Sequence, residues 1–411
     1  MARIGVVQPR RRIITIGLWI STSTEKGRGI VRGVAQFAHD HGDVRVHRFP
    51  KAEPLRESAL AALGVRGLIA TLQSRRDLNR LLKTGLPFIN LTGEMHARGI
   101  STVRSDDVAV GRLAAQYFCN RGHRVLAYCG MRNYEGSDDR KRGMREVARK
   151  NGVKFESQDF DHAMVTKDPR VLFAPLERWL RSLPKPVGML VHSDDVCLHL
   201  VDACADLGLD IPRDIAVLGV STDSVRLAFA GTEISSIELN TREIGAAAGK
   251  MLLEMLSSGK RATGWPRDQL IRPLKIVTRR STDSRAVDDE LVVRALDFIR
   301  DNPSSSIGVP DVLRAVGSSR RRLELRFRTK LGRSIHNEIQ RQRFERAAEM
   351  MCEAGRSLTE IADAAGFRNG RHLSIAFRRH LDATPGELRR KLLAGQAGVH
   401  DVDPVFRRGA R

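Results

Sequence analysis

Short apolar runs alternate with helical stretches through the first two thirds of this 411-residue chain. The runs, rich in β-branched residues, stand at 13–19, 67–72, 87–91, 124–130, 187–192 and 215–220. Helical periodicity accompanies them at 27–41, 107–121, 138–151, 194–208 and 241–258. This alternation is typical of parallel sheets with helices on both faces. Because the runs are too many for one mononucleotide-sized unit, the pattern predicts two α/β lobes.

The charge of the chain favours a polyanionic partner. Lys and Arg total 70 against 48 Asp and Glu, which gives a net charge of +22. Such an imbalance favours nucleic acid over a membrane surface. The excess runs through both parts of the chain, however, so a general bias toward arginine would also explain it. Charge alone therefore locates no binding site.

The cysteines and the N-terminus indicate a protein that stays inside the cell. Cys119, Cys129, Cys197, Cys204 and Cys352 form no CxxC pair, which argues for reduced thiols and against zinc and disulfides. The first residues lack the apolar core of a signal peptide, and no apolar run reaches membrane-spanning length. We therefore expect a cytoplasmic protein with no metal, no cofactor and no membrane partner.

Polar residues follow the apolar runs of the two expected lobes. In open α/β sheets ligands bind beyond the carboxyl ends of the strands, and hydroxyls, carboxylates and guanidinium groups together suit a small polyhydroxylated ligand. The candidate ligand-binding residues are Arg28, Asp106, Arg140, Ser193, Asp194, Ser221 and Thr222. Two other interpretations stay open, because Asp106 and Asp194 stand where helix N-caps belong and Arg140 could be a solvated charge.

Common catalytic signatures are missing from this region. It contains no GxGxxG after the first run, no GxxxxGK[ST] phosphate loop, no GxSxG nucleophile elbow and no HExxH. The twelve histidines are scattered. The sequence therefore predicts a binding protein and not an enzyme.

The segment SLTEIADAAGF at 357–367 has the pattern of a short helix that ends in a tight turn. Ser357 and Glu360 have the spacing of a capping box, Ile361 starts an apolar inner face, and Gly366 permits the turn. A second helix follows, capped by Asn369, with its apolar residues recurring every four positions. This pattern predicts a helix-turn-helix unit.

An earlier segment, SIGVPDVLRAVG, repeats the pattern, with Gly317 at the turn and Ser319 as the cap of the second helix. Both second helices carry L-x-x-x-F, in LELRF and LSIAF. Arginines at a helix N-terminus suit the major groove, where they can bind guanine, and two units can read two successive grooves. The candidate DNA-binding residues are Ser319, Arg320, Arg321, Arg322, Arg326, Asn369, Arg371, His372, Ser374 and Arg378. Ordinary amphipathic hairpins with solvated arginines are the alternative, which the duplication disfavours.

Three stretches resemble the sugar-sensing domain of LacI/GalR-type regulators, which is related to periplasmic binding proteins. They are SDDVAVGRLAAQYFCNRGHRVLAYCG, DDRKRGMREV and SDDVCLHLVDACADLGLDIPRDIAVLGVS. The resemblance implies that Asp106, Arg140, Ser193, Asp194 and Ser221 line an effector cleft. The family often has GFDD or GYDD where this chain has GVST, so a serine stands in place of an expected carboxylate, and the effector's identity stays open.

The duplicated unit, with its closing ATPGELRRK, resembles the AraC/XylS DNA-binding domain over residues 288–391. Both domains in one chain resemble sugar-responsive regulators of the xylose type. The resemblance implies a homodimeric transcriptional regulator, with activation as the favoured mode, that binds double-stranded promoter DNA and works with RNA polymerase. Its effector would be a small sugar or sugar acid, which changes how the DNA-binding domains are arranged.

The expected organisation follows from these assignments. A disordered N-terminus (1–12) precedes a two-lobed periplasmic-binding-protein-like effector domain (13–281), a linker (282–290), an all-α domain with two helix-turn-helix motifs (291–391) and a basic flexible tail (392–411). The predicted function is effector-gated regulation of carbohydrate-utilisation genes. The alternative is a carbohydrate-binding protein or an enzyme with a basic tail that binds DNA without sequence preference.

Overall fold

The computed structural model describes residues 13–92, 99–161, 169–259, 266–282, 289–302, 307–351 and 356–393. The chain divides into two compact units. The first comprises Met1–Asp106, Tyr134–Gly136 and Asn240–Ile271, and the second comprises Asp107–Asn133, Ser137–Leu239 and Arg272–Arg411. The predicted N-terminal segment 1–12, most of the predicted linker and nearly all of the predicted tail lie outside the described residues.

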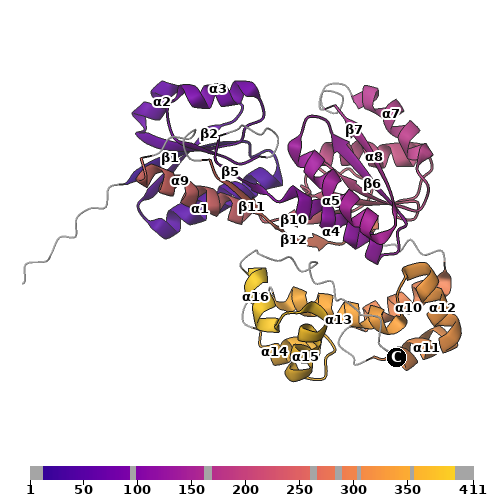
Figure 1. Cartoon of the computed structure of the whole chain (residues 1–411). Helices are drawn as coiled ribbons and strands as arrows, with labels where there is room; N and C mark the ends of the chain where they lie inside the picture. The colour runs from indigo at the N-terminus through magenta and orange to yellow at the C-terminus, as the bar shows by residue number, and fades with distance from the viewer. Residues whose placement is uncertain are drawn as a thin grey trace, which may run out of the picture. The chain divides into compact units, whose positions relative to one another are not determined.

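The first unit is built on a six-stranded parallel sheet in the order β11-β5-β4-β3-β1-β2 (Figure 1). Its strands are β1 (Ile14–Ile20), β2 (Val44–Pro50), β3 (Val65–Ala70), β4 (Phe88–Asn90), β5 (Thr102–Ser105) and β11 (Asp268–Ile271). Helices α1 (Glu25–His41) and α9 (Thr241–Ser257) share one apolar core with the sheet. Helices α2 (Glu57–Ala62) and α3 (Arg75–Lys83) share a separate core with it. Burial of apolar residues on two faces thus gives the predicted three-layer lobe.

The second unit contains a sheet of the same size in the order β12-β10-β9-β8-β6-β7. Its strands are β6 (Val125–Met131), β7 (Lys154–Phe160), β8 (Val187–Val191), β9 (Ile215–Val220), β10 (Ser235–Leu239) and β12 (Pro273–Val277), of which β12 runs antiparallel to β10. Its helices are α4 (Asp107–Asn120), α5 (Glu135–Asn151), α7 (Pro169–Ser182) and α8 (Asp194–Asp206). Helices α4 and α5 pack on the sheet through one core. The predicted pair of α/β lobes is confirmed.

The segment after β12 is held on the second lobe. A 3₁₀ turn, η2 (Arg280–Thr282), buries Ser281 and Thr282. The Ser281 hydroxyl donates to the Val217 carbonyl (2.6 Å), and the Thr282 hydroxyl hydrogen-bonds Tyr117 (2.6 Å) and Ser235 (2.6 Å). Residue 282, which the sequence assigned to a linker, is therefore part of the lobe.

The remainder of the second unit is helical (Figure 1). Its helices are α10 (Glu290–Asp301), α11 (Val309–Val316), α12 (Arg320–Leu331), α13 (Ile335–Met351), α14 (Leu358–Ala364), α15 (Gly370–Leu381) and α16 (Pro385–Leu393). One apolar core joins α10, α11 and α12 to the start of α13, and another joins the rest of α13 to α14, α15 and α16. Each predicted helix-turn-helix pair thus has its own core, and α13 contributes to both.

No helix within the described ranges is both long and apolar enough to cross a membrane.

Candidate effector site and DNA-binding surface

The predicted effector residues fall in both units. Arg28 and Asp106 belong to the first unit, and the other five belong to the second. Arg28, in the first turn of α1, donates to Glu25 (2.9 Å) and to the Thr22 carbonyl (3.2 Å). The backbone N–H of Asp106, just beyond β5, donates to the Ile271 carbonyl (2.8 Å). The two residues therefore follow the ends of strands β1 and β5, as the sequence predicted.

In the second unit, close packing of α4 on α5 fixes an ion pair. A Cβ on Gly111 would lie 2.0 Å from the Arg140 carbonyl oxygen, and one on Gly143 would lie 2.2 Å from the Val108 carbonyl oxygen. Only glycine allows the two backbones to approach so closely. This approach brings the Asp107 carboxylate to Arg140 Nε at 2.7 Å, with both side chains buried.

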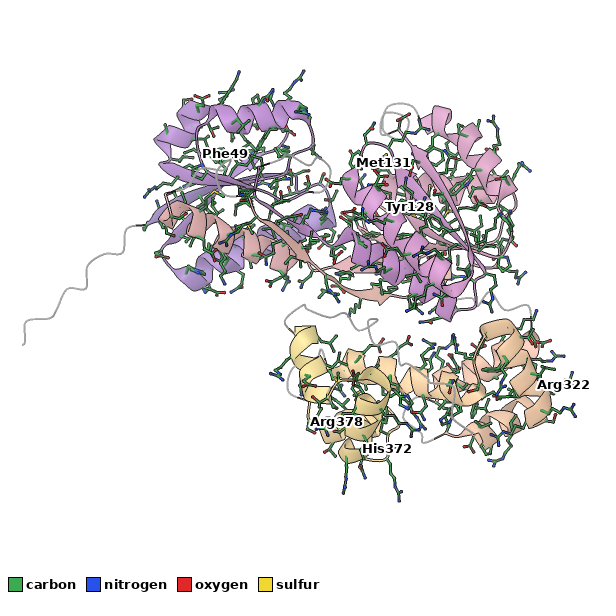
Figure 2. All side chains as sticks on the ribbon, viewed as in Figure 1. Phe49, Tyr128, Met131, Arg322, His372 and Arg378 are labelled. Atoms are coloured by element: carbon green, nitrogen blue, oxygen red, sulfur yellow. The ribbon has the colours of Figure 1, made fainter. Side chains whose placement is uncertain are left out.

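Arg140 is not a solvated charge. Its residue is 6% exposed, and Nη1 donates to the carbonyl of His192 (3.1 Å), just after β8. Burial would lower the pKa of this guanidinium, but the Asp107 carboxylate raises the pKa above its usual value. His192 Nδ1 in turn lies 3.2 Å from the hydroxyl of the buried Tyr128. Figure 2 labels Tyr128 within the second lobe. Among the described residues, Nη2 of Arg140 has no hydrogen-bond partner, so it is available to a ligand.

Ser193 and Asp194 have different roles at the start of α8. The Ser193 hydroxyl is the N-cap, since it accepts from the Val196 N–H (3.5 Å). Asp194 Oδ2 accepts instead from the backbone N–H of Asp223 (3.0 Å), which ties α8 to the loop after β9. Asp194 Oδ1 is buried and has no partner among the described residues. A buried carboxylate oxygen without a donor is costly, which favours a ligand hydroxyl or a proton at this position.

Ser221 and Thr222 form the turn after β9. The Ser221 N–H donates to the Ile237 carbonyl (2.8 Å), and the Thr222 N–H donates to the Ser236 hydroxyl (3.0 Å). Ser221 has φ 51°, in the left-handed region that Asn, Asp and Gly tolerate best. Asp223 is buried, and its carboxylate accepts from the Val225 N–H (3.0 Å), so it is held within the turn.

The titration of Asp194 leads to a testable pH dependence. Burial raises the pKa of this carboxyl from 3.8 to about 6. The folded state therefore binds more protons than the unfolded state between about pH 4 and 6, and Asp194 loses its stabilising contribution as the pH rises through this window. A pKa difference of this size corresponds to about 3 kcal/mol in the free energy of unfolding.

We expect Asp194→Asn to be more stable than the wild type at pH 7 by up to about 3 kcal/mol, because asparagine keeps the acceptor for Asp223 without the charge. The difference should disappear below about pH 4. Urea unfolding of both full chains across this range measures it. If the free energy of unfolding changed with pH in the same way for both proteins, Asp194 would not have a raised pKa.

The helical region has the local structure expected of two helix-turn-helix units. Gly317 and Gly366, at the two turns, have φ 66° and 77°. The Ser319 hydroxyl accepts from the Arg322 N–H (3.4 Å), and the Asn369 side chain accepts from the His372 N–H (2.8 Å). The capping box of α14 is also present, because the Ser357 N–H donates to Glu360 (2.7 Å). The predicted caps and turns are confirmed.

The second helix of each unit turns an apolar side inward and a basic side outward. Leu323, Phe327 and Leu331 of α12 are buried. So are Leu373 and Phe377 of α15. We call the side opposite these residues the outer face of each helix. The exposed basic residues among the candidate DNA-binding residues are Arg320, Arg321, Arg322, Arg371, His372 and Arg378, and Figure 2 shows three of them at the surface of the helical region.

Two candidate DNA-binding residues have contacts inside the helical region instead. Both oxygens of Asp289, the N-cap of α10, accept from Arg326 Nη1 (2.9 and 2.8 Å). This contact holds α12 against α10. The Ser374 hydroxyl donates to the Gly370 carbonyl within α15 (2.9 Å). The exposed arginines of the first turns are consequently better placed for DNA than Arg326 or Ser374.

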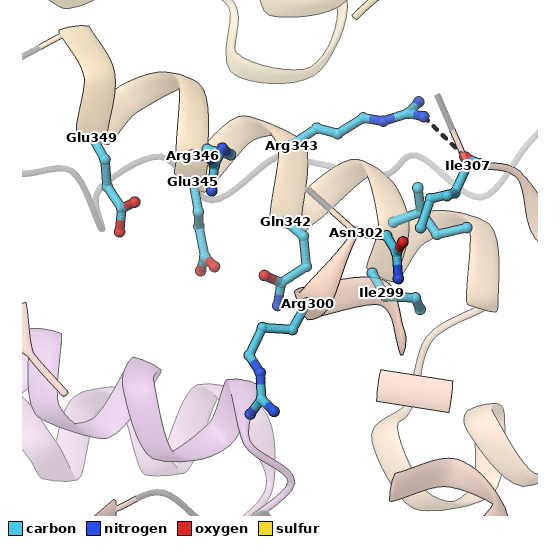
Figure 3. Close-up of a pocket in the computed structure, with 10 residues that line it drawn as sticks. Ile299, Arg300, Asn302, Ile307, Gln342, Arg343, Glu345, Arg346 and Glu349 are labelled. Atoms are coloured by element: carbon cyan, nitrogen blue, oxygen red, sulfur yellow. Dashed lines mark hydrogen bonds between the residues drawn. The ribbon is translucent and has the colours of Figure 1, made fainter. Parts of the chain in front are cut away.

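Two arginines of helix α13 bind the two helix-turn-helix pairs. Arg343 extends from α13 and donates from Nη2 to the carbonyl of Ile307, just before α11 (2.9 Å; Figure 3). Burial lowers the pKa of this guanidinium. Arg346 Nε donates to the carbonyl of Ala364, at the end of α14 (3.0 Å). A hollow of about 190 Å³ beside these residues is lined by α10 and α13. The first helix of each unit is thus attached to the same long helix.

Sequence reasoning missed several residues of the second-unit site. Asp107 and His192, which bind Arg140, were not identified. Tyr128 was counted only as part of a strand, and Ser137, whose hydroxyl lies 3.0 Å from the Tyr128 hydroxyl, was not considered. The doublet Asp106–Asp107 offered a signal, since either carboxylate could follow the strand. No pattern in the sequence indicated the role of the His192 carbonyl, because a backbone group contributes it.

Comparisons with known proteins agree with both halves of this description. Residues 115–282 match the periplasmic binding protein-like domain family, and residues 312–391 match a helix-turn-helix domain family. The chain is 26% identical to the xylose operon regulatory protein of Haemophilus influenzae, over 80% of this chain and 85% of that one. It is 24% identical to the protein of the same name from Escherichia coli K12, over 79% and 83%. A solved structure of the xylose-binding transcription activator XylR has a TM-score of 0.58 at 22% identity, covering 92% of this chain and 97% of that one.

Proposed function

We propose, from the premise that this chain joins a periplasmic-binding-protein-like domain to an AraC-type helix-turn-helix domain, that it is a sequence-specific transcriptional regulator gated by a small sugar. The observation that carries the proposal is the duplication of a helix-turn-helix unit with an exposed basic first turn, on the same chain as two ligand-binding-type lobes. Two such units can enter two successive major grooves of double-stranded promoter DNA.

The second-unit site supports a polyhydroxylated effector. Arg140 offers Nη2 as a donor, and Asp194 offers Oδ1 as an acceptor that no described residue uses. A sugar hydroxyl can both donate and accept, so one ligand satisfies both groups. Arg28 and Asp106, which the sequence predicts as effector ligands, lie beyond the ends of strands β1 and β5 of the first unit. The relatives named for xylose favour a pentose or a closely related sugar or sugar acid.

Helix α4 is the element that could connect the effector site with the helical region. Asp107 at its start binds Arg140, and the carbonyl of Asn120 at its end accepts from Arg333 Nη2 (2.7 Å), just after α12. The Tyr117 hydroxyl, near the end of α4, hydrogen-bonds Thr282 (2.6 Å). Thr282 belongs to η2 (Arg280–Thr282), the segment that leads from the second lobe to the helical region and that we call the junction. We infer that effector binding shifts α4 and the junction together. The effector can do so only by binding one arrangement more tightly than the other.

The proposal extends to location, partners and mode of action. The protein acts in the cytoplasm, as a homodimer, on genes for carbohydrate use. It activates transcription by working with RNA polymerase. It catalyses no reaction of its own, in line with relatives that are regulators.

Selection from a random duplex library by the full chain tests the proposal. We expect one enriched sequence, bound at two adjacent major grooves, and an affinity that changes when a pentose, hexose or sugar acid is added. The same sugars should raise the melting temperature of the full chain. Tight binding of DNA with no enriched sequence would favour the alternative, a carbohydrate-binding protein or enzyme with a basic surface.

Ser221 is the residue we expect to set effector preference. Serine offers one short neutral group where a carboxylate would accept two hydrogen bonds, so it leaves space for a larger or anionic substituent. The left-handed backbone at 221 accommodates aspartate, so Ser221→Asp should fold. We expect this variant to bind D-xylose more tightly than the wild type in calorimetry. Equal xylose affinities for the two proteins would refute this role.

A further inference from the structure

Two large apolar side chains are exposed on the otherwise basic outer faces of α12 and α15. Leu325 is 66% exposed and Ile375 is 56% exposed. They occupy the same place in the two helix-turn-helix units, because each stands two residues before the buried phenylalanine of L-x-x-x-F. A single exposed leucine is ordinary on a protein surface. Its repetition at equivalent positions indicates a shared role.

Helix geometry places these side chains at the centre of each outer face. Successive residues are rotated by about 100°, so a residue two positions before the phenylalanine lies about 200° from it, opposite the core. In α12 the neighbours one turn away are Arg321, Arg322, Arg328 and Thr329, which are exposed. In α15 the neighbours are Arg371 and His372, which are also exposed. Each apolar side chain therefore has exposed basic residues beside it along its helix, and Leu325 also borders a hollow that Asp289, Glu290 and Leu291 help to line.

The major groove offers one apolar group on a base edge, the C5-methyl of thymine. An aliphatic side chain at the centre of a helix that enters the groove can contact this methyl, while basic neighbours bind phosphates or guanine. We propose that Leu325 and Ile375 are specificity-determining residues that each read a thymine methyl. The inference rests on the proposed DNA binding. A protein partner is disfavoured, because one exposed apolar side chain on each helix offers no large continuous apolar surface.

Replacing thymine with uracil tests the contact, since uracil keeps the base pair and lacks only the methyl group. The duplex selected by the wild-type chain is synthesised with uracil at one thymine at a time, and affinity is measured for the wild type, Leu325→Ala and Ile375→Ala. We expect the DNA affinity of the wild type to fall about fourfold when the thymine that Leu325 contacts is replaced, and by the same factor for the thymine that Ile375 contacts. Burial of one methyl group predicts a loss of this size. Leu325→Ala should show no further loss at its own thymine and the full loss at the thymine of Ile375.

Each alanine variant is thus the control for the other. Leu82→Ala, which truncates a leucine that is 44% exposed on α3, controls for loss of apolar surface elsewhere. Leu325→Met, which keeps an apolar side chain, should restore sensitivity to the methyl group. If the wild type binds a selected sequence but no uracil substitution couples to either residue, this inference is wrong and the proposed function stands. If the wild type selects no sequence, both are wrong. A change in self-association without any coupling would assign the two residues to a protein contact.

Discussion

Replacing both Arg321 and Arg322 with alanine is expected to abolish specific DNA binding. Both residues are exposed in the first turn of α12, and neither has an ion-pair partner among the described residues. A bidentate arginine contact to guanine is worth about 1–3 kcal/mol, so loss of two should cost about 2–6 kcal/mol, or roughly 30-fold to more than 10,000-fold in Kd. Fluorescence anisotropy with the selected duplex at fixed salt measures this loss.

The control must remove the same charge without touching the proposed surface. Arg112→Ala combined with Arg142→Ala does so, because both arginines are exposed on α4 and α5 and pair with acidic neighbours. Non-specific attraction to phosphates should fall to a similar extent in both double variants. Only the α12 variant should lose the preference for the selected duplex over a scrambled one. Equal losses for the two proteins would remove α12 from base recognition.

Much of the fold could be predicted because apolar periodicity reports burial directly. The helices predicted at 107–121 and 194–208 correspond to α4 (Asp107–Asn120) and α8 (Asp194–Asp206). Strands β2, β7, β10, β11 and β12 were missed. Four of them are edge strands, at the two ends of each sheet, and the interior strand β10 (Ser235–Leu239) begins with two serines in place of apolar residues. An edge strand with polar residues on its outer side lacks the continuous apolar run that identified the central strands.

The candidate site was harder to predict than the fold. Side chains at strand ends follow from topology, so Asp194 and Ser221 could be chosen from the sequence. Which atoms remain free for a ligand depends on three-dimensional contacts. Ser193 is used as a cap, Arg326 binds Asp289, and Asp194 keeps one oxygen without a donor. The sequence shows the residue types, but these pairings appear only when helices from distant segments pack together.

Loss of the Glu338 carboxylate should destabilise the helical region more than any other single charge change considered above. Glu338 lies in the first turn of α13 and is fully buried. Its oxygens accept from Arg341 Nη2 (2.9 Å), from Gln342 Nε2 (3.2 Å) and from Arg333 Nε. Glu338→Ala would leave two largely buried guanidinium groups without this partner, and breaking a buried ion pair costs about 3–5 kcal/mol.

Native-state hydrogen exchange of the full chain can locate this loss of stability, since it measures the opening of α12 and α13 separately from that of the lobes. Glu349→Ala, which removes an exposed carboxylate from the same helix, is the matched control. Glu338→Gln should fall between the two, because glutamine keeps one acceptor oxygen but loses the charge. Since Arg333 also binds the Asn120 carbonyl at the end of α4, Glu338→Ala should reduce the effect of the sugar on DNA affinity as well. If exchange in α12 and α13 is no faster than in Glu349→Ala, then Glu338 is not the residue that holds Arg333 in place, and the path from α4 to the recognition helices must run through the junction at Thr282 instead.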